Sequence, residues 1–441
     1  MADTYTPTEM LGRLVGFDTT SVLSNMALIA FVRDYLKGHG VESTLLPNED
    51  NTKANLYATI GPRAPGGVVL AGHSDVVPVA GQPWDSDPFQ MVEKNGRLYG
   101  RGTADMKCFP AVALAMVPEF LKRDLKVPIH IALTYDEEIG CLSAWSLAEQ
   151  MRDHLPQPHA LIVGEPTMMQ VVHSHKAINS FFTEFTGHEA HSSLVESGVS
   201  AVHYAGELLH FLNRLQDELR ARARPSDFNP GYGTINVGVI NGGTAGNILA
   251  RKCKVQWEYR ALPGDDPMEV LDRVQAYCDG ELLPRMRRYA PDATIETRKR
   301  AGVPPLIPEQ HNPADLLCRH LTGANASASV AYAAEAGIFQ QAGFHVVICG
   351  PGDIAQAHQP NEFIETSQVA ACEQFMRRLA DWSVKGGAKS SPLPPGEVAS
   401  AKRERVRGLT KHPSPDCPRF ARPVDLSRWE RLRRVGDDFY L

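Results

Sequence analysis

The stretch GVVLAGHSDVVP at residues 67–78 decides the fold. Its first half is a short run of Gly, Val, Leu and Ala, which is typical of a strand buried on both faces of a parallel sheet. Two similar runs follow, VPIHIALTY at residues 127–135 and HALIVG at residues 159–164. Helical patterns alternate with strand patterns in this first third of the chain, and residues 26–40 are one segment with helical spacing. The pattern predicts an α/β fold with a mixed, mostly parallel sheet and helices on both faces.

Ionisable side chains stand where these three runs end. His73 ends the first run, Glu137 and Glu138 follow the second, and Glu165 follows the third. In open α/β sheets the carboxyl ends of the parallel strands form one edge, and sites lie at that edge. We therefore expect these four side chains to lie close together.

Two further segments supply similar side chains. Asp105 lies in the Gly-rich segment YGRGTADMKC at residues 99–108, and His358 lies in IAQAHQP at residues 354–360. A carboxylate has two oxygens and can bridge two cations, and two metals about 3.5–4 Å apart make a hydrolytic centre. Imidazole and carboxylate ligands suit Zn²⁺ best, with Co²⁺ or Mn²⁺ as substitutes. The sequence predicts a hydrolase with two zinc ions per subunit, held by His73, Asp105, Glu138, Glu165 and His358.

Two side chains beside these ligands have other expected roles. Glu137 is left over as a base, because adjacent residues diverge and only one of the Glu137–Glu138 pair needs to bind metal. Asp75 is two residues from His73, so both side chains point to one face of the strand. A metal-bound imidazole donates its other N–H to an acceptor that orients the ring. Asp75 is expected to be that acceptor.

The length of the chain and the order of its predicted helices and strands indicate two domains. The chain has 441 residues, more than one hydrophobic core usually supports. Between about residues 181 and 291 the pattern becomes strand, helix, two strands, helix, as in a small α+β layer. We expect catalytic segments at residues 1–180 and 292–385, an inserted domain at 181–291, and a disordered basic tail rich in Pro, Ser and Arg at 386–441.

Composition limits the partners and the compartment. The net charge is −6; residues 389–441 carry 12 Lys and Arg against 7 Asp and Glu, so the rest carries −11. An acidic body does not favour nucleic-acid binding. No apolar run approaches the roughly 20 residues of a membrane span, and the polar N-terminus shows no secretory signal. Eight widely spaced cysteines without a CxxC pair indicate reduced thiols and a cytoplasmic protein.

The segments HSDVVP, GRGTADMK, DEE, GEP and AHQPNE occur in this order between residues 73 and 362. Through them the chain, over about residues 5–385, resembles the M20 metallopeptidase family. The resemblance implies that His73 and Glu165 bind one zinc ion and that Glu138 and His358 bind the other. It also implies that Asp105 bridges the two ions, that Glu137 is the general base, and that the peptide after Asp105 is cis.

The inserted layer resembles the dimerisation domain of that family. The segment GHEAHSS at residues 187–193 matches a family histidine that reaches into the partner's active site and supports the oxyanion. This resemblance implies a homodimer in which His191 plays that part. Asn247 in GGTAGNI matches an asparagine that acts beside the histidine, and Arg260 in EYRALPG matches an arginine that binds the substrate carboxylate.

Longer stretches resemble the deacylases of the family that act on N2-acetyl-L-ornithine. They are residues 16–25, 73–89, 335–344 and 349–365. The resemblance implies a small acyl-amino acid as substrate, with L-ornithine and acetate as products, in arginine biosynthesis. Glu335 is expected to receive the side-chain ammonium of the substrate.

Three alternatives remain open at the level of sequence. Another specificity of the same family is the nearest, because the metal motifs are shared by desuccinylases, aminoacylases and dipeptidases. A non-catalytic scaffold would be expected to lose the base, yet Glu137 is present. A phosphoesterase with two metals would carry more basic residues at the strand ends than this chain does.

Overall fold

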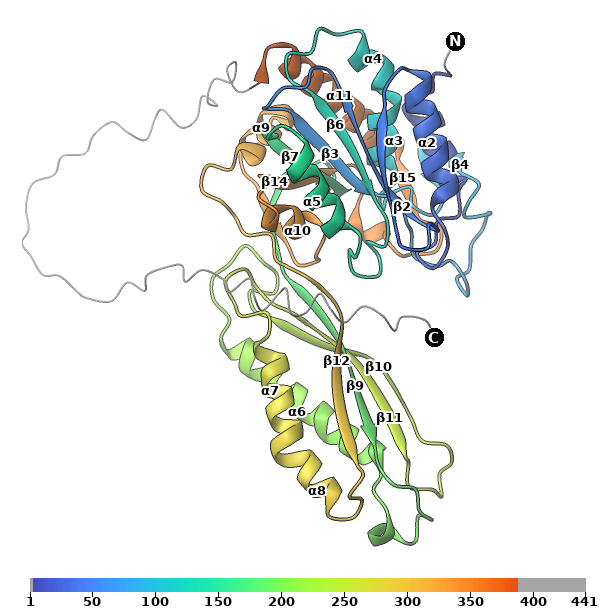
Figure 1. The fold of residues 1–441 in the computed structure, drawn as a ribbon, viewed down its shortest axis with the longest axis vertical. Helices are drawn as coiled ribbons and strands as arrows, with labels where there is room; N and C mark the ends of the chain where they lie inside the picture. Colours follow the sequence, from blue (N-terminus) through green and yellow to red (C-terminus); the bar gives the residue numbers. More distant parts are fainter. Residues whose placement is uncertain (1–2, 388–441) are drawn as a thin grey trace, which may run out of the picture. The chain divides into compact units, whose positions relative to one another are not determined.

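The computed structural model describes residues 3–387, and its largest element is an eight-stranded mixed sheet (Figure 1). The strand order is β1-β2-β6-β3-β7-β14-β8-β13. The central strands β6, β3, β7 and β14 are parallel, whereas β1 and β2 are antiparallel additions at one edge. The bounds are β1 Ser43–Pro47, β2 Ala54–Ile60, β3 Val68–His73, β6 Ile129–Thr134, β7 Ala160–Pro166, β8 Val172–His175, β13 Ala328–Val330 and β14 Val346–Gly350.

Alternate residues of the central strands pack into two separate cores. In β3, Val68 and Leu70 belong to one buried cluster, and Val69 and Ala71 belong to another. Successive strand residues point to opposite faces, so helices must cover both. The first face is covered by α1 Pro7–Val15, α2 Met26–Gly38, α3 Cys108–Ala115, α4 Val117–Leu121, α9 Pro313–Thr322 and α11 Thr366–Val384. The second is covered by α5 Ala144–His154 and α10 Ala336–Gln341. The α/β fold with helices on both faces is confirmed.

A second sheet has four antiparallel strands in the order β10-β11-β9-β12. Its helices α6–α8 bury Phe181 and Trp257 from the sheet in one cluster. The sequence pattern predicts three of its strands; the fourth, β12, reads TIETRKRAGV and lacks a clear apolar alternation. This strand begins after residue 291, the position at which the sequence pattern ends the inserted layer. The bounds are β9 Ile178–Thr186, α6 Ala201–Ala221, β10 Thr234–Gly242, β11 Lys252–Arg260, α7 Glu269–Tyr277, α8 Leu283–Arg287 and β12 Thr294–Val303.

A small third sheet joins segments that are far apart in the sequence. Its order is β15-β5-β4, with β4 at Val92–Lys94, β5 at Arg97–Tyr99 and β15 at Phe363–Glu365. Phe363 pairs with Tyr99 in this sheet. The segment after His358 is thereby held beside the segment before Asp105, although they lie some 250 positions apart in the chain.

The structure also bears on the expectations about the cysteines, membrane-spanning helices and the C-terminal tail. The seven cysteines within residues 3–387 are all buried and unbonded, in keeping with reduced thiols. Among those residues no helix is both long enough and apolar enough to cross a membrane. The expected tail at 386–441 lies, apart from its first two residues, outside the described part of the chain.

Candidate metal centre

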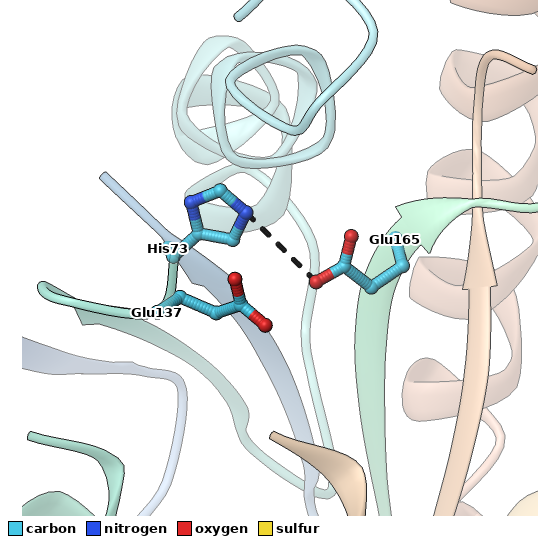
Figure 2. A group of neighbouring side chains, drawn as sticks. All are labelled: His73, Glu137 and Glu165. Atoms are coloured by element: carbon cyan, nitrogen blue, oxygen red, sulfur yellow. Dashed lines mark ion pairs between the residues drawn. The ribbon is translucent and has the colours of Figure 1, made fainter. Parts of the chain in front are cut away.

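Two neighbouring parallel strands present the first pair of candidate ligands. His73 is the last residue of β3, and Glu165 lies near the end of β7, which pairs with β3. His73 Nε2 is 3.8 Å from Glu165 Oε1, and the carboxylate of Glu137 points into the same space (Figure 2). The predicted convergence at the carboxyl edge of the sheet is therefore observed.

Asp105 lies between the two candidate histidines. Its Oδ1 is 3.1 Å from His73 Nε2, and its Oδ2 is 3.4 Å from His358 Nε2. His358 Nε2 is also 3.0 Å from Glu138 Oε2. One carboxylate thus faces two separate groups, with His73 and Glu165 on one side and His358 and Glu138 on the other. The peptide bond between Asp105 and Met106 is cis, as the resemblance implies.

Several buried carboxyl groups lie around Asp105, and nearby cations would stabilise their charged forms. Burial, together with neighbouring carboxylates, raises the pKa of Glu137 to about 8 and that of Glu138 to about 8. Burial also raises the pKa of Glu165 well above its usual range, with Asp105 and Glu137 contributing. Candidate ligand atoms of His73, Glu137 and Glu165, and of His73, Asp105 and Glu138, lie within 4.8 Å of one another. Oxygen and imidazole donors at this spacing fit two divalent cations.

These groups open into a cavity of about 360 Å³, a size suited to a small molecule. Arg260, at the end of β11, is the one Lys or Arg among its lining residues. Its Nε donates a hydrogen bond of 2.9 Å to Glu258, which leaves further N–H groups of the guanidinium available. The lining includes Asp105, Glu137, Glu138, Cys141, Glu165, Arg260, Tyr332 and His358.

His191 and Asn247 lie together but do not line this cavity. His191 forms an isolated bridge with Ile248, and Ser192 N donates to the carbonyl oxygen of Asn247 at 2.9 Å. Both side chains are exposed. The pair that the sequence places near the oxyanion is therefore assembled on the surface of the chain that carries it.

Glu335 is a candidate site residue that does not line the cavity. It precedes α10, is completely buried, and is absent from the cavity lining. It is close enough to Glu137 to contribute to the raised pKa of that residue. The expected contact between Glu335 and a substrate ammonium stays a prediction.

Asp75 orients the loop that carries Glu137 and Glu138, a role that the sequence does not reveal. His73 Nδ1 lies 2.9 Å from the backbone oxygen of Asp75 and 3.5 Å from its Oδ1. Asp75 is therefore the acceptor for this imidazole chiefly through its backbone carbonyl and less through its carboxylate. The carboxylate instead accepts hydrogen bonds from Ser21 Oγ at 2.6 Å, Glu137 N at 3.2 Å and Glu138 N at 3.3 Å. Its negative charge also favours the adjacent imidazole as a ligand.

Asp75→Asn is expected to weaken metal binding about 10- to 100-fold. The amide has one acceptor oxygen in place of two, so it cannot hold both backbone N–H groups and the Ser21 hydroxyl as before. Competition with a chelator measures the affinity directly. Asp153→Asn, at an exposed position on α5, is the control and should bind metal as the unaltered protein does. Equal affinities for the two variants would contradict the role given to Asp75.

Glu362 anchors the loop of Asp105. Its Oε1 accepts hydrogen bonds from Ala104 N at 2.8 Å and Asp105 N at 3.0 Å, and its Oε2 accepts one from Gly102 N at 2.9 Å. Arg101 Nη1 donates to the same Oε2 at 2.8 Å, and both side chains are almost fully buried. The residue lies within the AHQPNE segment, but the sequence gives no sign of these non-local contacts.

Arg101 extends this anchor toward the second histidine. Its Nη2 donates to Gln82 Oε1 at 2.6 Å, and Gln82 Nε2 donates to the backbone oxygen of His358 at 2.9 Å. The loops of Asp105 and His358 are therefore held by one connected set of hydrogen bonds, buried at Glu362 and more exposed toward His358. This set helps to fix the distance between the Asp105 carboxylate and His358.

Arg101→Met is expected to lower the free energy of unfolding by about 3–5 kcal/mol, because it leaves the buried Glu362 carboxylate without its cation. Urea unfolding followed by circular dichroism measures the change. Arg152→Met removes an exposed ion pair with Asp153 and should cost less than about 1 kcal/mol. Equal losses of unfolding free energy in the two variants would show that the buried ion pair stabilises the protein no more than the exposed one.

Comparisons with known proteins agree with this geometry. The model of Peptidase family M20/M25/M40 matches residues 69–382. Acetylornithine deacetylase of Proteus mirabilis (strain HI4320) is 34% identical over 370 residues, which cover 82% of this chain and 92% of that protein. The M20 metallo-carboxypeptidase Sso-CP2 of Sulfolobus solfataricus has 16% identity and a TM-score of 0.69, covering 87% of this chain and all of that one. A Bacillus subtilis protein described as a dinuclear metal binding peptidase of the M20 family has 13% identity and a TM-score of 0.56, over 86% and 99% of the two chains.

The chain belongs to the M20 family. It is a metal-dependent amidohydrolase, and its candidate ligands lie where the carboxyl ends of the sheet strands meet.

Proposed function

We propose that this protein removes the acetyl group from N2-acetyl-L-ornithine, releasing L-ornithine and acetate, with two zinc ions per subunit. The observation that carries the proposal is the cavity in which Asp105 faces two histidine and carboxylate groups while Arg260 supplies a cation. The similarity to the Proteus mirabilis deacetylase over most of both chains supports this substrate. The reaction would supply ornithine for arginine biosynthesis.

Different residues of the site would bind the cations and transfer the proton during hydrolysis. His73, Asp105 and Glu165 would hold one cation, and His358, Asp105 and Glu138 the other. When bound, two such cations polarise an amide carbonyl and activate water at neutral pH. Glu137 accepts the proton of the attacking water and returns it to the departing amine. Cys141 Sγ lies 3.3 Å from Glu137 Oε1, where its S–H donates to the carboxylate and orients it.

A substrate panel tests the proposed specificity. The zinc-loaded protein is offered N2-acetyl-L-ornithine, N-succinyl-diaminopimelate, N-acetylmethionine and a dipeptide, and kcat/KM is measured for each. We expect a clear preference for the first. A preference for another member of the panel would keep the hydrolytic centre and refute the substrate. No turnover with metal bound would refute the enzymatic function.

Arg260→Met should raise KM for the acyl-amino acid about 10-fold or more while kcat changes little. A charged hydrogen bond to the substrate carboxylate is worth about 1.5–3 kcal/mol, and methionine keeps the length of the side chain without the charge. The control is Arg220→Met, which removes an exposed arginine of α6. A fall in kcat at constant KM would place Arg260 with the reacting atoms and not with the carboxylate.

The surface position of His191 and Asn247 supports a homodimer in which each chain completes its partner's site. Exposed apolar side chains stand close to His191 in the sequence and on its bridge partner, with Leu194 at 56%, Val195 at 64% and Ile248 at 40% exposure. Strand β10 is also an edge strand of its sheet, with Val239 and Ile240 both 45% exposed. A second copy would cover such surfaces.

Mixing two inactive variants tests this arrangement. His191→Ala and Glu137→Gln chains are unfolded together, refolded together and loaded with zinc. In a mixed dimer, the chain with an intact Glu137 receives an intact His191 from its partner. Random pairing should restore about a quarter of the sites. Activity no greater than the sum of the separate variants would refute an exchanged histidine.

A further inference from the structure

Tyr332 belongs to the wall of the cavity and carries a buried polar group. Tyr332 lies in the bend between β13 and α10 and belongs to the cavity lining. Its oxygen is buried and has no hydrogen-bond partner among residues 3–387. A buried hydroxyl that makes no hydrogen bond destabilises the folded chain. Its position in a cavity wall indicates that a ligand supplies the missing partner.

The surroundings of Tyr332 determine what it can do. Burial raises the pKa of the phenol, and the carboxylates of Glu165 and Asp105 raise it further, so the hydroxyl keeps its proton at neutral pH. It is therefore a donor, placed near the carboxylates that face His73. A substrate carboxylate is disfavoured there by like charge, and Arg260 is the cation of the cavity. The acyl oxygen is neutral in the substrate and gains negative charge only during reaction.

We propose that Tyr332 is a catalytic residue whose hydroxyl donates a hydrogen bond to the acyl oxygen of the substrate as the carbonyl is attacked. This proposal rests on the proposed amide hydrolysis and adds a donor from the same chain to the expected donor His191. A neutral donor aimed at an oxygen that becomes negative binds the transition state more strongly than the substrate.

Tyr332→Phe removes only the hydroxyl and tests the proposal. With whichever N-acyl amino acid the zinc-loaded protein hydrolyses best, we expect kcat to fall about 10- to 1000-fold and KM to change less than about threefold. Zinc affinity, measured by chelator competition, should stay the same. A phosphonate analogue of the substrate, which mimics the tetrahedral species, should bind more weakly by the factor lost in kcat/KM.

Tyr259→Phe is the matched control. The hydroxyl of Tyr259 is also buried and without a partner within residues 3–387, but it lies in β11 and packs in the core of the second sheet. This variant should keep the kcat of the unaltered protein. If Tyr332→Phe also kept it, or if it raised KM alone, or if it lost zinc, the proposal would be overturned. If the unaltered protein preferred another substrate to N2-acetyl-L-ornithine, the proposed specificity would be refuted. The comparison of Tyr332→Phe with Tyr259→Phe would still hold, because it uses the substrate that the protein hydrolyses best.

Discussion

Glu137→Gln should retain both metal ions and lose about 10²- to 10⁴-fold in kcat, the range that a positioned general base contributes. Glutamine keeps the size of the side chain but cannot take a proton from the attacking water. Its backbone N–H would still bind Asp75, so the loop should keep its position. Steady-state kinetics of the zinc-loaded variant, with zinc content measured on the same sample, check the prediction.

Glu42→Gln is the control for this substitution, because Glu42 is an exposed glutamate on another segment. It should have the kcat of the unaltered protein. Since Glu137 lies within 4.8 Å of candidate ligand atoms of His73 and Glu165, loss of zinc from Glu137→Gln is the informative alternative. That result would make Glu137 a ligand, and another group would have to act as the base.

Asp105→Ala is expected to abolish activity and to weaken metal binding at least about 100-fold, more than loss of a supporting residue does. The carboxylate is the one group that faces both histidines, through Oδ1 to His73 and Oδ2 to His358. Its removal takes one oxygen from each half of the site. Calorimetric titration with zinc measures both the affinity and the number of ions bound.

Asp105→Asn refines this test. The amide offers one oxygen in place of two, so it can serve only one side of the site. We expect one zinc ion to bind with nearly unchanged affinity and the second to bind weakly. Two tight ions in Asp105→Asn would show that Asp105 does not bridge.

The convergence of the candidate ligands could be predicted because it follows from local patterns. Buried strands give unmistakable apolar runs, and residues such as His73 and Glu165 directly at their ends must meet at one edge of a parallel sheet. His358 is different, because it lies in a loop that has no periodic pattern. Its imidazole alone made it a candidate ligand, and the AHQPNE motif then placed it in the site through the resemblance.

The supporting contacts could not be predicted, because they join segments far apart in the chain. Glu362 accepts the N–H groups of residues 102, 104 and 105, and Asp75 accepts those of Glu137 and Glu138. Backbone N–H groups are common to nearly all residues, so no sequence signal marks the ones that a distant carboxylate will bind. Strand β12 was missed for another reason: its position in the sheet is set by pairing with β9 and not by its own alternation.

Glu335 shows what a resemblance leaves open. An acidic residue in a segment that resembles deacylases suggested a contact with a substrate ammonium, but the chain buries it completely at the start of α10. Tyr332, three residues earlier, has no acidic or metal-binding character that would mark it in the sequence, yet it lines the cavity. Sequence similarity located this segment near the site, and only the structure shows which side chain faces the cavity.

The number of zinc ions bound by the metal-free protein is the measurement that tests the central claim most directly. Titration by calorimetry, with metal content checked by mass spectrometry after gel filtration, should give two ions per chain in the unaltered protein. Hydrolysis should appear as the sites fill, and His358→Ala should reduce the count of tight ions to one. A single tight ion in the unaltered protein, with full activity at that stoichiometry, would contradict a centre built on a bridging Asp105.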